Sequence, residues 1–281
     1  MIAIDLGSNT IRACKMRKLD SGNFECEYSF ERIVGSARGL GSKGLANDAM
    51  DRIRLAIGEL VSEAKFDSSI AVATQAFREA ANSSEFFRDI RDKFGIEFKI
   101  ISGELEAFLT RVGVENRAKI LSLNIDNSLL IDLGGASTEI SFGDFSRSFE
   151  FGIITALQSD KSALIEEAKR YIGEFECDNI ILTSGVPTTA LAIKRGMNYE
   201  NYNAKMINGA KIDKDDLIYV ANLLKTATNK DELVGKNRAD LVVKGCEILL
   251  DILPNKSCIV IDDGLREGLF IAKELNLKKL K

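Results

Sequence analysis

The chain contains two copies of one pattern, a short apolar strand that runs directly into an Asp-Leu-Gly turn. In the first copy Ile2-Ala3-Ile4 precedes Asp5-Leu6-Gly7, and in the second Leu129-Leu130-Ile131 precedes Asp132-Leu133-Gly134. A single glycine turn after a strand is a weak signal, more often structural than functional. Its recurrence in both halves of the chain, with the aspartate in the same place, indicates two related domains built around equivalent strands.

The elements that follow the two turns also recur in the same order. An alternating apolar stretch, residues 24–30, comes after the first turn, and a hairpin across Gly143-Asp144 comes after the second. Helical segments that alternate with short apolar strands then complete each half. This order predicts two α/β domains, residues 1–123 and 124–281, with a ligand cleft where the two glycine turns face each other.

The residues within the turns suit a bound phosphate. Glycine allows a positive φ and lets a phosphate oxygen come close to backbone amides, while hydroxyl and amide side chains add donors. An aspartate directly before such a turn, as at Asp5 and Asp132, can hold Mg²⁺ through water. The predicted phosphate-binding residues of the two turns are Gly7, Ser8, Asn9, Thr10, Gly134, Gly135, Ser137 and Thr138.

Two glutamates lie where they can serve acid–base chemistry. Glu139 follows Asp132 by seven residues, so its carboxylate can point back into the predicted cleft. Glu106 lies in the first turn of a helix that opens after Ser102-Gly103, where a carboxylate can position and deprotonate a water. Charge complementarity at a helix N-terminus, worth roughly 0.3–1 kcal/mol, explains Glu106 equally well. The neighbouring Glu104 competes for the same role, but the two side chains diverge on a helix.

Arg78 and Asp263 each open a predicted helix after a buried strand. The Arg78 guanidinium can clamp a phosphate with two parallel hydrogen bonds, although a surface ion pair with Glu79 or Glu85 is the more frequent fate of an arginine. The segment from Asp263 to Gly268 can close the floor of the cleft or meet Mg²⁺. It can equally be a helix cap in which Asp263 accepts free backbone amides.

The 281-residue chain has no histidine, and this excludes several kinds of site. Ser-His-Asp and Cys-His catalysis, phosphohistidine chemistry and His/Asp two-metal clusters all require that residue. The five cysteines show no short paired spacing, which argues against zinc and for reduced thiols in a cytoplasmic protein. The net charge of −4 gives no reason to expect nucleic acid or an anionic membrane as a partner, and no stretch is apolar enough to span a bilayer.

Five motifs, taken together and in order, resemble the exopolyphosphatase/guanosine pentaphosphate phosphohydrolase (Ppx/GppA) family. They span nearly the whole chain, and their order is much more specific than any one of them. The segments that carry the resemblance are Asp5-Leu6-Gly7-Ser8-Asn9-Thr10-Ile11-Arg12, Thr74 to Ala80 with Arg78, Ile101-Ser102-Gly103-Glu104-Leu105-Glu106-Ala107, Asp132 to Glu139, and Asp263-Gly264-Leu265-Arg266-Glu267-Gly268.

The resemblance implies two actin/Hsp70/sugar-kinase-like (ribonuclease H-like) α/β domains. It implies hydrolysis of a terminal phosphoanhydride, either of inorganic polyphosphate or of guanosine pentaphosphate. Glu106 would activate the attacking water, and Asp132 and Glu139 would serve Mg²⁺ and that water. Asp5 would bind the metal or its water shell, and the turns with Arg78 would hold phosphates. A homodimer is compatible with such an architecture.

The chain departs from the family pattern in places that bear on its substrate. Leu105 replaces an acidic or polar residue, and Val186-Pro187 stands where Gly-Thr is more usual in a segment expected to face a nucleotide base. Longer relatives carry a C-terminal His-Asp domain that this histidine-free chain lacks, which favours short polyphosphates. Two other functions remain open: a non-catalytic alarmone or polyphosphate sensor, and, less in keeping with the sequence, a small-molecule kinase of the same architecture.

Overall fold

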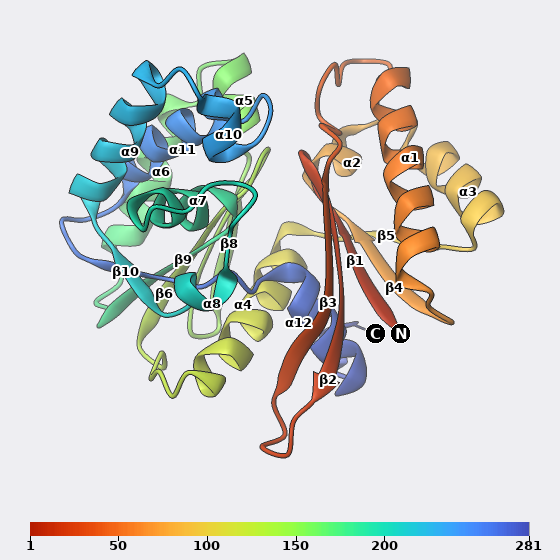
Figure 1. Ribbon diagram of the computed structural model, residues 1–281, viewed down its shortest axis with the longest axis horizontal. Helices are drawn as coiled ribbons and strands as arrows, with labels where there is room; N and C mark the ends of the chain where they lie inside the picture. Colours follow the sequence, from red (N-terminus) through yellow and green to blue (C-terminus); the bar gives the residue numbers. More distant parts are fainter. Residues whose placement is uncertain (281) are drawn as a thin grey trace. The chain divides into compact units, whose positions relative to one another are not determined.

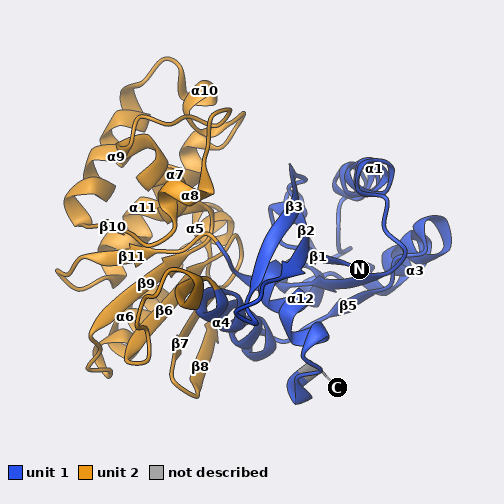
Figure 2. Ribbon diagram, turned by 60° about the horizontal axis from the view of Figure 1, so that its bottom comes forward, with its two compact units in different colours: residues 1–116, 263–281 blue, residues 117–262 orange. Residues whose placement is uncertain are grey.

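The computed structural model describes residues 1–280, which divide into two compact units. Unit 1 comprises residues 1–116 together with the chain from Asp263 onward, and unit 2 comprises residues 117–262 (Figure 2). Each unit has a mixed sheet of its own, with helices packed against it (Figure 1). The prediction of two related α/β domains is therefore confirmed for the fold.

Unit 1 is built on a five-stranded sheet in the order β3-β2-β1-β4-β5. The first three strands of the chain form an antiparallel meander, and the other two lie parallel to β1. Central strand β1 is buried on both faces, as expected when helices cover both sides of a sheet. The strands are β1 (Ile2–Leu6), β2 (Thr10–Lys18), β3 (Phe24–Ile33), β4 (Ser69–Ala73) and β5 (Phe98–Ile100).

The helices of unit 1 include one from the far end of the sequence. The last helix of the chain packs on β1 and β2, and its apolar side joins Ala3, Cys14 and Leu109 in one core. The helices are α1 (Asn47–Ala64), α2 (Gln75–Glu79), α3 (Ser83–Phe94), α4 (Gly103–Ile120) and α12 (Leu265–Glu274), followed by a short 3₁₀ turn (Lys278–Leu280).

Unit 2 repeats the same strand topology with one addition. Its sheet has the order β10-β11-β9-β6-β7-β8, in which β6, β7 and β8 form the antiparallel meander and β9 and β11 lie parallel to β6. Strand β10 adds an antiparallel edge. The strands are β6 (Ser128–Leu133), β7 (Thr138–Phe142), β8 (Phe145–Phe149), β9 (Asn179–Thr183), β10 (Ala210–Ile212) and β11 (Cys258–Val260).

The helices of unit 2 bury a large apolar core against this sheet. Helix α11 packs on α5, α6, α7 and α9, and its buried face joins the core that runs from Leu129 to Val260. The helices are α5 (Ile153–Gln158), α6 (Ser162–Gly173), α7 (Gly185–Lys194), α8 (Ala204–Ile207), α9 (Lys214–Thr226), α10 (Lys230–Val234) and α11 (Ala239–Ile252).

The two units are not the two stretches predicted from the sequence. The predicted second domain, residues 124–281, includes α12, which belongs to unit 1, and the division near the middle of the chain falls at Asn116, inside α4. The physical reason is burial: Leu269, Phe270 and Ile271 are covered by the β1–β2 side of unit 1. Unit 1 contains segments from both ends of the chain, so a single boundary along the sequence cannot separate the two units.

No helix within residues 1–280 is both long enough and apolar enough to cross a lipid bilayer.

Candidate functional site

The first glycine turn joins β1 to β2 as a tight hairpin. The N–H of Gly7 donates to the carbonyl of Thr10 at 2.9 Å, and Ser8 is buried at the tip. The backbone at Gly7 does not have a positive φ, and a Cβ there would lie 3.5 Å from the Thr10 oxygen. The expectation that this glycine supplies a left-handed backbone is therefore wrong.

The second glycine turn has the same hydrogen bond in unit 2. The N–H of Gly134 donates to the carbonyl of Ser137 at 3.0 Å. Gly134 is again not in the left-handed region, but a Cβ there would lie 2.9 Å from the Ser137 oxygen. Glycine is required here by the close approach of backbone rather than by φ.

The second half of the turn corrects a prediction, because the fully buried Thr138 hydroxyl donates to the carbonyl of Phe151 at 2.8 Å. Thr138 therefore anchors the hairpin, and its one hydroxyl proton is not available to a phosphate.

In both units the segment after the third strand satisfies the carbonyl groups of the glycine turn. In unit 1 the N–H groups of Val34 and Gly35 donate to Asn9 O, and that of Ala37 donates to Ser8 O. In unit 2 Ile153 N donates to Gly134 O at 3.0 Å and Ile154 N donates to Gly135 O at 2.7 Å.

Two N–H groups in each turn donate to no backbone carbonyl within residues 1–280. Among the described residues, no backbone carbonyl accepts from the N–H of Ser8, Asn9, Gly135 or Ala136. Each turn thus has two carbonyl oxygens that accept from the backbone and two amides that donate to no described backbone carbonyl, which is the polarity that an anion requires.

Gly152 holds the second turn in place by direct backbone contact. A Cβ at this position would lie 2.5 Å from Gly135 C and 2.6 Å from both Ala136 N and Gly134 O. We expect Gly152→Ala to displace the turn, to lower the free energy of unfolding by about 2 kcal/mol and to weaken phosphate binding. Gly173→Ala is the matched control, because a Cβ there meets nothing within 4 Å. Denaturant melts of both variants test this, and equal stability of the two would contradict it.

The acidic residues before the turns lie in cross-strand rows that repeat between the units. In unit 1 the ladder pairs Asp5 with Arg12 and Arg12 with Glu31, and in unit 2 it pairs Asp132 with Glu139 and Glu139 with Ser148. Directly opposed residues point to the same face, with Cβ atoms about 4.5–5.5 Å apart. Each aspartate therefore lies beside a charged residue of the second strand.

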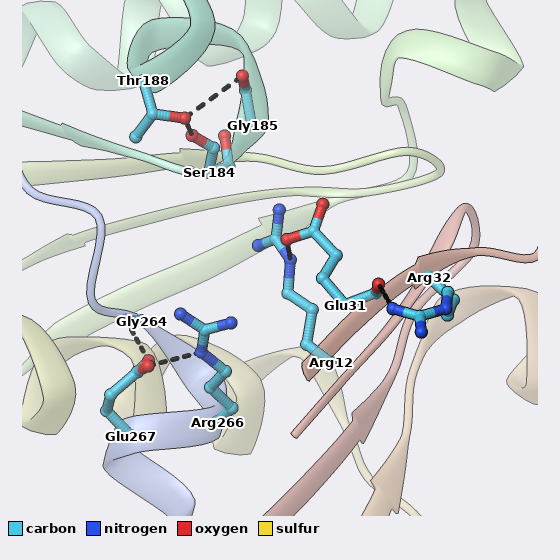
Figure 3. Close-up of polar contacts among 9 residues, drawn as sticks. All are labelled: Arg12, Glu31, Arg32, Ser184, Gly185, Thr188, Gly264, Arg266 and Glu267. Atoms are coloured by element: carbon cyan, nitrogen blue, oxygen red, sulfur yellow. Dashed lines mark hydrogen bonds and ion pairs between the residues drawn. The ribbon is translucent and has the colours of Figure 1, made fainter. Parts of the chain in front are cut away.

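The charge in these rows differs between the two units. In unit 1 Arg12 Nε donates to Glu31 Oε2 at 3.1 Å, an ion pair visible in Figure 3. In unit 2 the equivalent position is Glu139, which is 3 % exposed and whose Oε1 accepts from Ser148 Oγ at 2.8 Å. The row of unit 2 is thus acidic where the row of unit 1 contains a cation.

Asp132 and Glu139 fit a divalent cation that also binds phosphate. Their carboxylates share one face of neighbouring strands, and carboxylate oxygen is the donor that Mg²⁺ prefers. Within residues 1–280 no group of three or more His, Cys, Asp or Glu is arranged to hold a metal. Mg²⁺ usually relies on one or two carboxylates, water and substrate phosphates, so two carboxylates are sufficient. Asp5 lies in unit 1 and does not belong to this pair.

Glu106 is a buried carboxylate held by Arg78. The side chain lies in the first turn of α4 and its residue is 8 % exposed, whereas Glu104 is exposed. Arg78 Nη1 donates to Glu106 Oε2 at 3.1 Å and to Ile101 O at 2.6 Å. Arg78 Nη2 is buried and has no hydrogen-bond partner. An unpaired buried cationic N–H is costly, and an anion such as phosphate would satisfy it.

Glu104 serves the helix rather than the site. The pKa of its carboxyl is lowered by its own backbone N–H and by the Ser102 hydroxyl, with a smaller contribution from Arg78. This is the behaviour of a carboxylate that satisfies the free amides at a helix N-terminus. Of the two glutamates that competed for the catalytic role, only Glu106 is buried beside Arg78.

The Asp-Gly-Leu-Arg-Glu-Gly segment opens α12 with a capping contact from Glu267, a residue that the sequence did not single out for this role. Glu267 Oε2 accepts from the N–H of Gly264 at 2.9 Å, and Arg266 forms an ion pair with the same carboxylate (Figure 3). The predicted capping residue, Asp263, lies before Gly264, the N-cap residue of α12. The buried Glu267 therefore takes part in the cap of α12.

The strand-to-helix junction after β9 is a strained feature that the sequence did not reveal. Ser184 has φ 82° and ψ 179°, a conformation that is normally restricted to glycine. Its hydroxyl donates to Leu133 O at 2.9 Å, and Thr188 Oγ1 donates back to Ser184 O at 2.8 Å (Figure 3). The Leu133 bond ties this junction to the strand that ends in the second glycine turn.

The three buried cysteines do not offer a nucleophile. Burial raises the pKa of the Cys246 and Cys258 thiols to about 12, and burial also raises the pKa of Cys14. Such thiols stay protonated near neutral pH, and the thiolate is the reactive form. With histidine absent, the carboxylates are left as the strongest candidates for acid–base work.

The two units, each with a mixed sheet that contains the same meander and parallel strands, define a two-domain α/β protein. The chain belongs to the Ppx/GppA phosphatase family, whose profile matches residues 22–277. Membership of a phosphatase family supports phosphohydrolase activity.

Solved structures with the same fold span nearly the whole chain. The PPX-GPPA enzyme of Aquifex aeolicus is 22% identical and has a TM-score of 0.77, with 96% of this chain and 98% of that chain covered. An exopolyphosphatase from Cytophaga hutchinsonii is 20% identical with a TM-score of 0.78, covering 99% of this chain and 98% of that one. At this level of identity the two structures establish the fold.

Proposed function

We propose that this chain removes the terminal phosphate of inorganic polyphosphate, preferring short chains, or of guanosine pentaphosphate. The observation that supports this most is the pair formed by Arg78 and Glu106, a buried carboxylate held by a guanidinium that keeps one buried N–H without a partner. A binding protein for polyanions gains nothing from a buried carboxylate at its anion site, since like charges repel. A hydrolase that must deprotonate water has a use for both groups.

In this proposal the turns hold phosphate oxygens through backbone amides. The N–H groups at Ser8 and Asn9 in unit 1 and at Gly135 and Ala136 in unit 2 are unused by backbone carbonyls, and Ser8 and Ser137 add hydroxyls. Arg78 Nη2 supplies a cationic donor. The buried unpartnered atom of Asn9 is Oδ1, so a half-turn of this amide is needed to present its donor to phosphate.

Glu106 acts as the general base toward the attacking water. The carboxylate takes one proton as the water oxygen forms a bond to the terminal phosphorus, and the bond from phosphorus to the bridging oxygen breaks. The products are inorganic phosphate and a polyphosphate shorter by one unit, or guanosine tetraphosphate. Arg78, whose Nη1 donates to Glu106 Oε2 at 3.1 Å, orients the carboxylate.

Asp132 and Glu139 would hold Mg²⁺. Asp5, a residue of unit 1, would act on the water shell of the cation. When bound, the cation supplies positive charge to the transferring phosphoryl group. The acidic row in unit 2 suits this role because Ser148 fixes Glu139 Oε1 and leaves the glutamate on the same strand face as Asp132.

A phosphate-release assay tests the proposal. Purified protein with Mg²⁺ should release phosphate from tripolyphosphate or guanosine pentaphosphate, and much less from ATP. Chelation of divalent cations should abolish the release and added Mg²⁺ should restore it. Tight binding of either substrate with no phosphate release would overturn the proposal in favour of a sensor. Transfer of phosphate from ATP to a small acceptor would instead indicate a kinase.

A further inference from the structure

Gln75 is buried at the start of α2 and lies between two charged side chains. Its residue is 6 % exposed. Its Oε1 accepts from Arg78 Nε at 2.8 Å, and its Nε2 donates to Glu79 Oε1 at 2.5 Å. Arginine can only donate and an ionised carboxylate can only accept, so these partners fix which end of the amide faces which side chain. Each hydrogen bond is therefore donated in the same sense, from Arg78 to Gln75 and from Gln75 to Glu79.

Three hydrogen bonds engage two of the three nitrogen atoms of the Arg78 guanidinium. Nε is taken by Gln75, and Nη1 is shared between Ile101 O and Glu106 Oε2. Nη2 is the nitrogen that remains buried without a partner. The guanidinium is planar, so fixing Nε and Nη1 also fixes the position of Nη2.

We propose that Gln75 is a positioning residue that aims Arg78 Nη2 at the substrate phosphate and Nη1 at Glu106. This inference rests on the proposed phosphohydrolase function and adds a residue outside the turns and carboxylates assigned to it. Gln75 suits the task because its amide is neutral. It orders the guanidinium and passes on the attraction of exposed Glu79 without adding a negative charge beside a phosphate.

A carboxylate at position 75 would behave differently. It would face Glu79 across the 2.5 Å contact that the amide now bridges, and like charges at this distance repel. It would also compete with Glu106 and with phosphate for Arg78. A neutral side chain of similar length without hydrogen-bonding groups, such as methionine, would instead leave Arg78 Nε without an acceptor.

The first test is a comparison of Gln75→Met with Gln158→Met, an exposed glutamine on α5 that serves as the control. With tripolyphosphate and Mg²⁺, Gln75→Met should raise KM about tenfold, because a hydrogen bond to a charged group is lost, and should lower kcat by a smaller factor. A purely structural role would lower the fraction of active protein and leave KM unchanged. An unchanged KM in folded Gln75→Met would overturn the proposal.

The second test is a double-mutant cycle with Arg78. If Gln75 acts through the guanidinium, Gln75→Met should have no further effect on KM in an Arg78→Met background. Additive effects in the cycle would overturn the proposal. Gln75→Glu should raise KM, and Glu79→Gln should reverse only part of that rise, since it removes the repulsion at position 79 and leaves a carboxylate beside Arg78.

Direct binding separates this proposal from the proposed function. Calorimetry with imidodiphosphate and Mg²⁺ measures phosphate affinity without turnover. A tenfold weaker affinity in Gln75→Met supports the positioning role even if the wild-type protein releases no phosphate, which would overturn only the hydrolase assignment. Equal affinity of wild type and Gln75→Met, or no binding by either, overturns the positioning role.

Discussion

Glu106→Gln should lower the rate of phosphate release about 10³-fold while the protein still binds tripolyphosphate. A general base contributes roughly 10²–10⁴-fold to a rate, and a glutamine has no basic oxygen to take the proton of the attacking water. Glutamine retains the size of the buried side chain, and its Oε1 can still accept from Arg78 Nη1, so the local fold is preserved. Single-turnover phosphate release, with calorimetric binding on the same samples, measures both quantities.

Glu104→Gln is the matched control for this experiment. The residue lies two positions earlier on α4, is exposed, and has its carboxyl pKa lowered by contacts with the helix start. Its replacement removes helix N-terminal charge, worth roughly 0.3–1 kcal/mol, and should leave the rate of phosphate release close to that of the wild type. Equal losses of rate in the two variants would show that charge at the helix end, and not a base, sets the activity.

The repeated strand-and-turn pattern was sufficient to predict the fold class. The two apolar strands that end in Asp-Leu-Gly turns, the alternating stretch of residues 24–30 and the hairpin across Gly143-Asp144 carry local information, because burial and periodicity are recorded in neighbouring residues. The observed sheets share the order of a meander followed by parallel strands, as two related domains require. The assignment of α12 to unit 1 was not predictable in this way, since it depends on contacts between residues more than 200 positions apart, such as Cys14 Sγ with Arg266 O.

Partners of individual side chains were harder to predict than elements. The sequence offered Glu79 or Glu85 as ion-pair partners for Arg78, but the guanidinium pairs with Glu106, 28 positions away. Glu79 instead accepts from Gln75. An arginine on a helix can pair with a carboxylate nearby in the sequence or with one that the sheet brings close. Here the neighbouring strands β4 and β5 place the starts of α2 and α4 side by side, and this decides the partner of Arg78.

The same limit applies to the turn residues and caps. Positive φ was expected at the turn glycines, and the left-handed positions lie elsewhere, for example at Gly35 and Gly44. Asn82 stands at the N-cap position of α3 but makes no capping bond, because its amide pairs with both the N–H and the carbonyl of Leu45. A polar side chain in a turn has several partners within reach, and tertiary packing selects among them.

The largest effect on stability is expected at Gly268, the last residue of the Asp-Gly-Leu-Arg-Glu-Gly motif. Helices α4 and α12 touch through their backbones at this point: a Cβ on Gly268 would lie 1.7 Å from Leu109 O and 3.0 Å from Gly113 N. A Cβ on Gly113 would in turn lie 2.2 Å from Gly264 O. Because backbone atoms of a helix cannot rotate away as a side chain can, the helices must separate to admit a methyl group.

Gly268→Ala should therefore lower the free energy of unfolding by about 3 kcal/mol or more, and the melting temperature by roughly 10 °C. Gly58→Ala on α1 is the control, since a Cβ there would meet only Phe94 Cε1 at 3.8 Å. Replacing a helical glycine with alanine where there is room stabilises a helix by about 1 kcal/mol, so the two substitutions should have opposite signs. Denaturant and thermal melts of both variants decide the matter. A stabilised Gly268→Ala would mean that α4 and α12 are not in backbone contact, and that the terminal helix does not need the motif's last glycine to pack in unit 1.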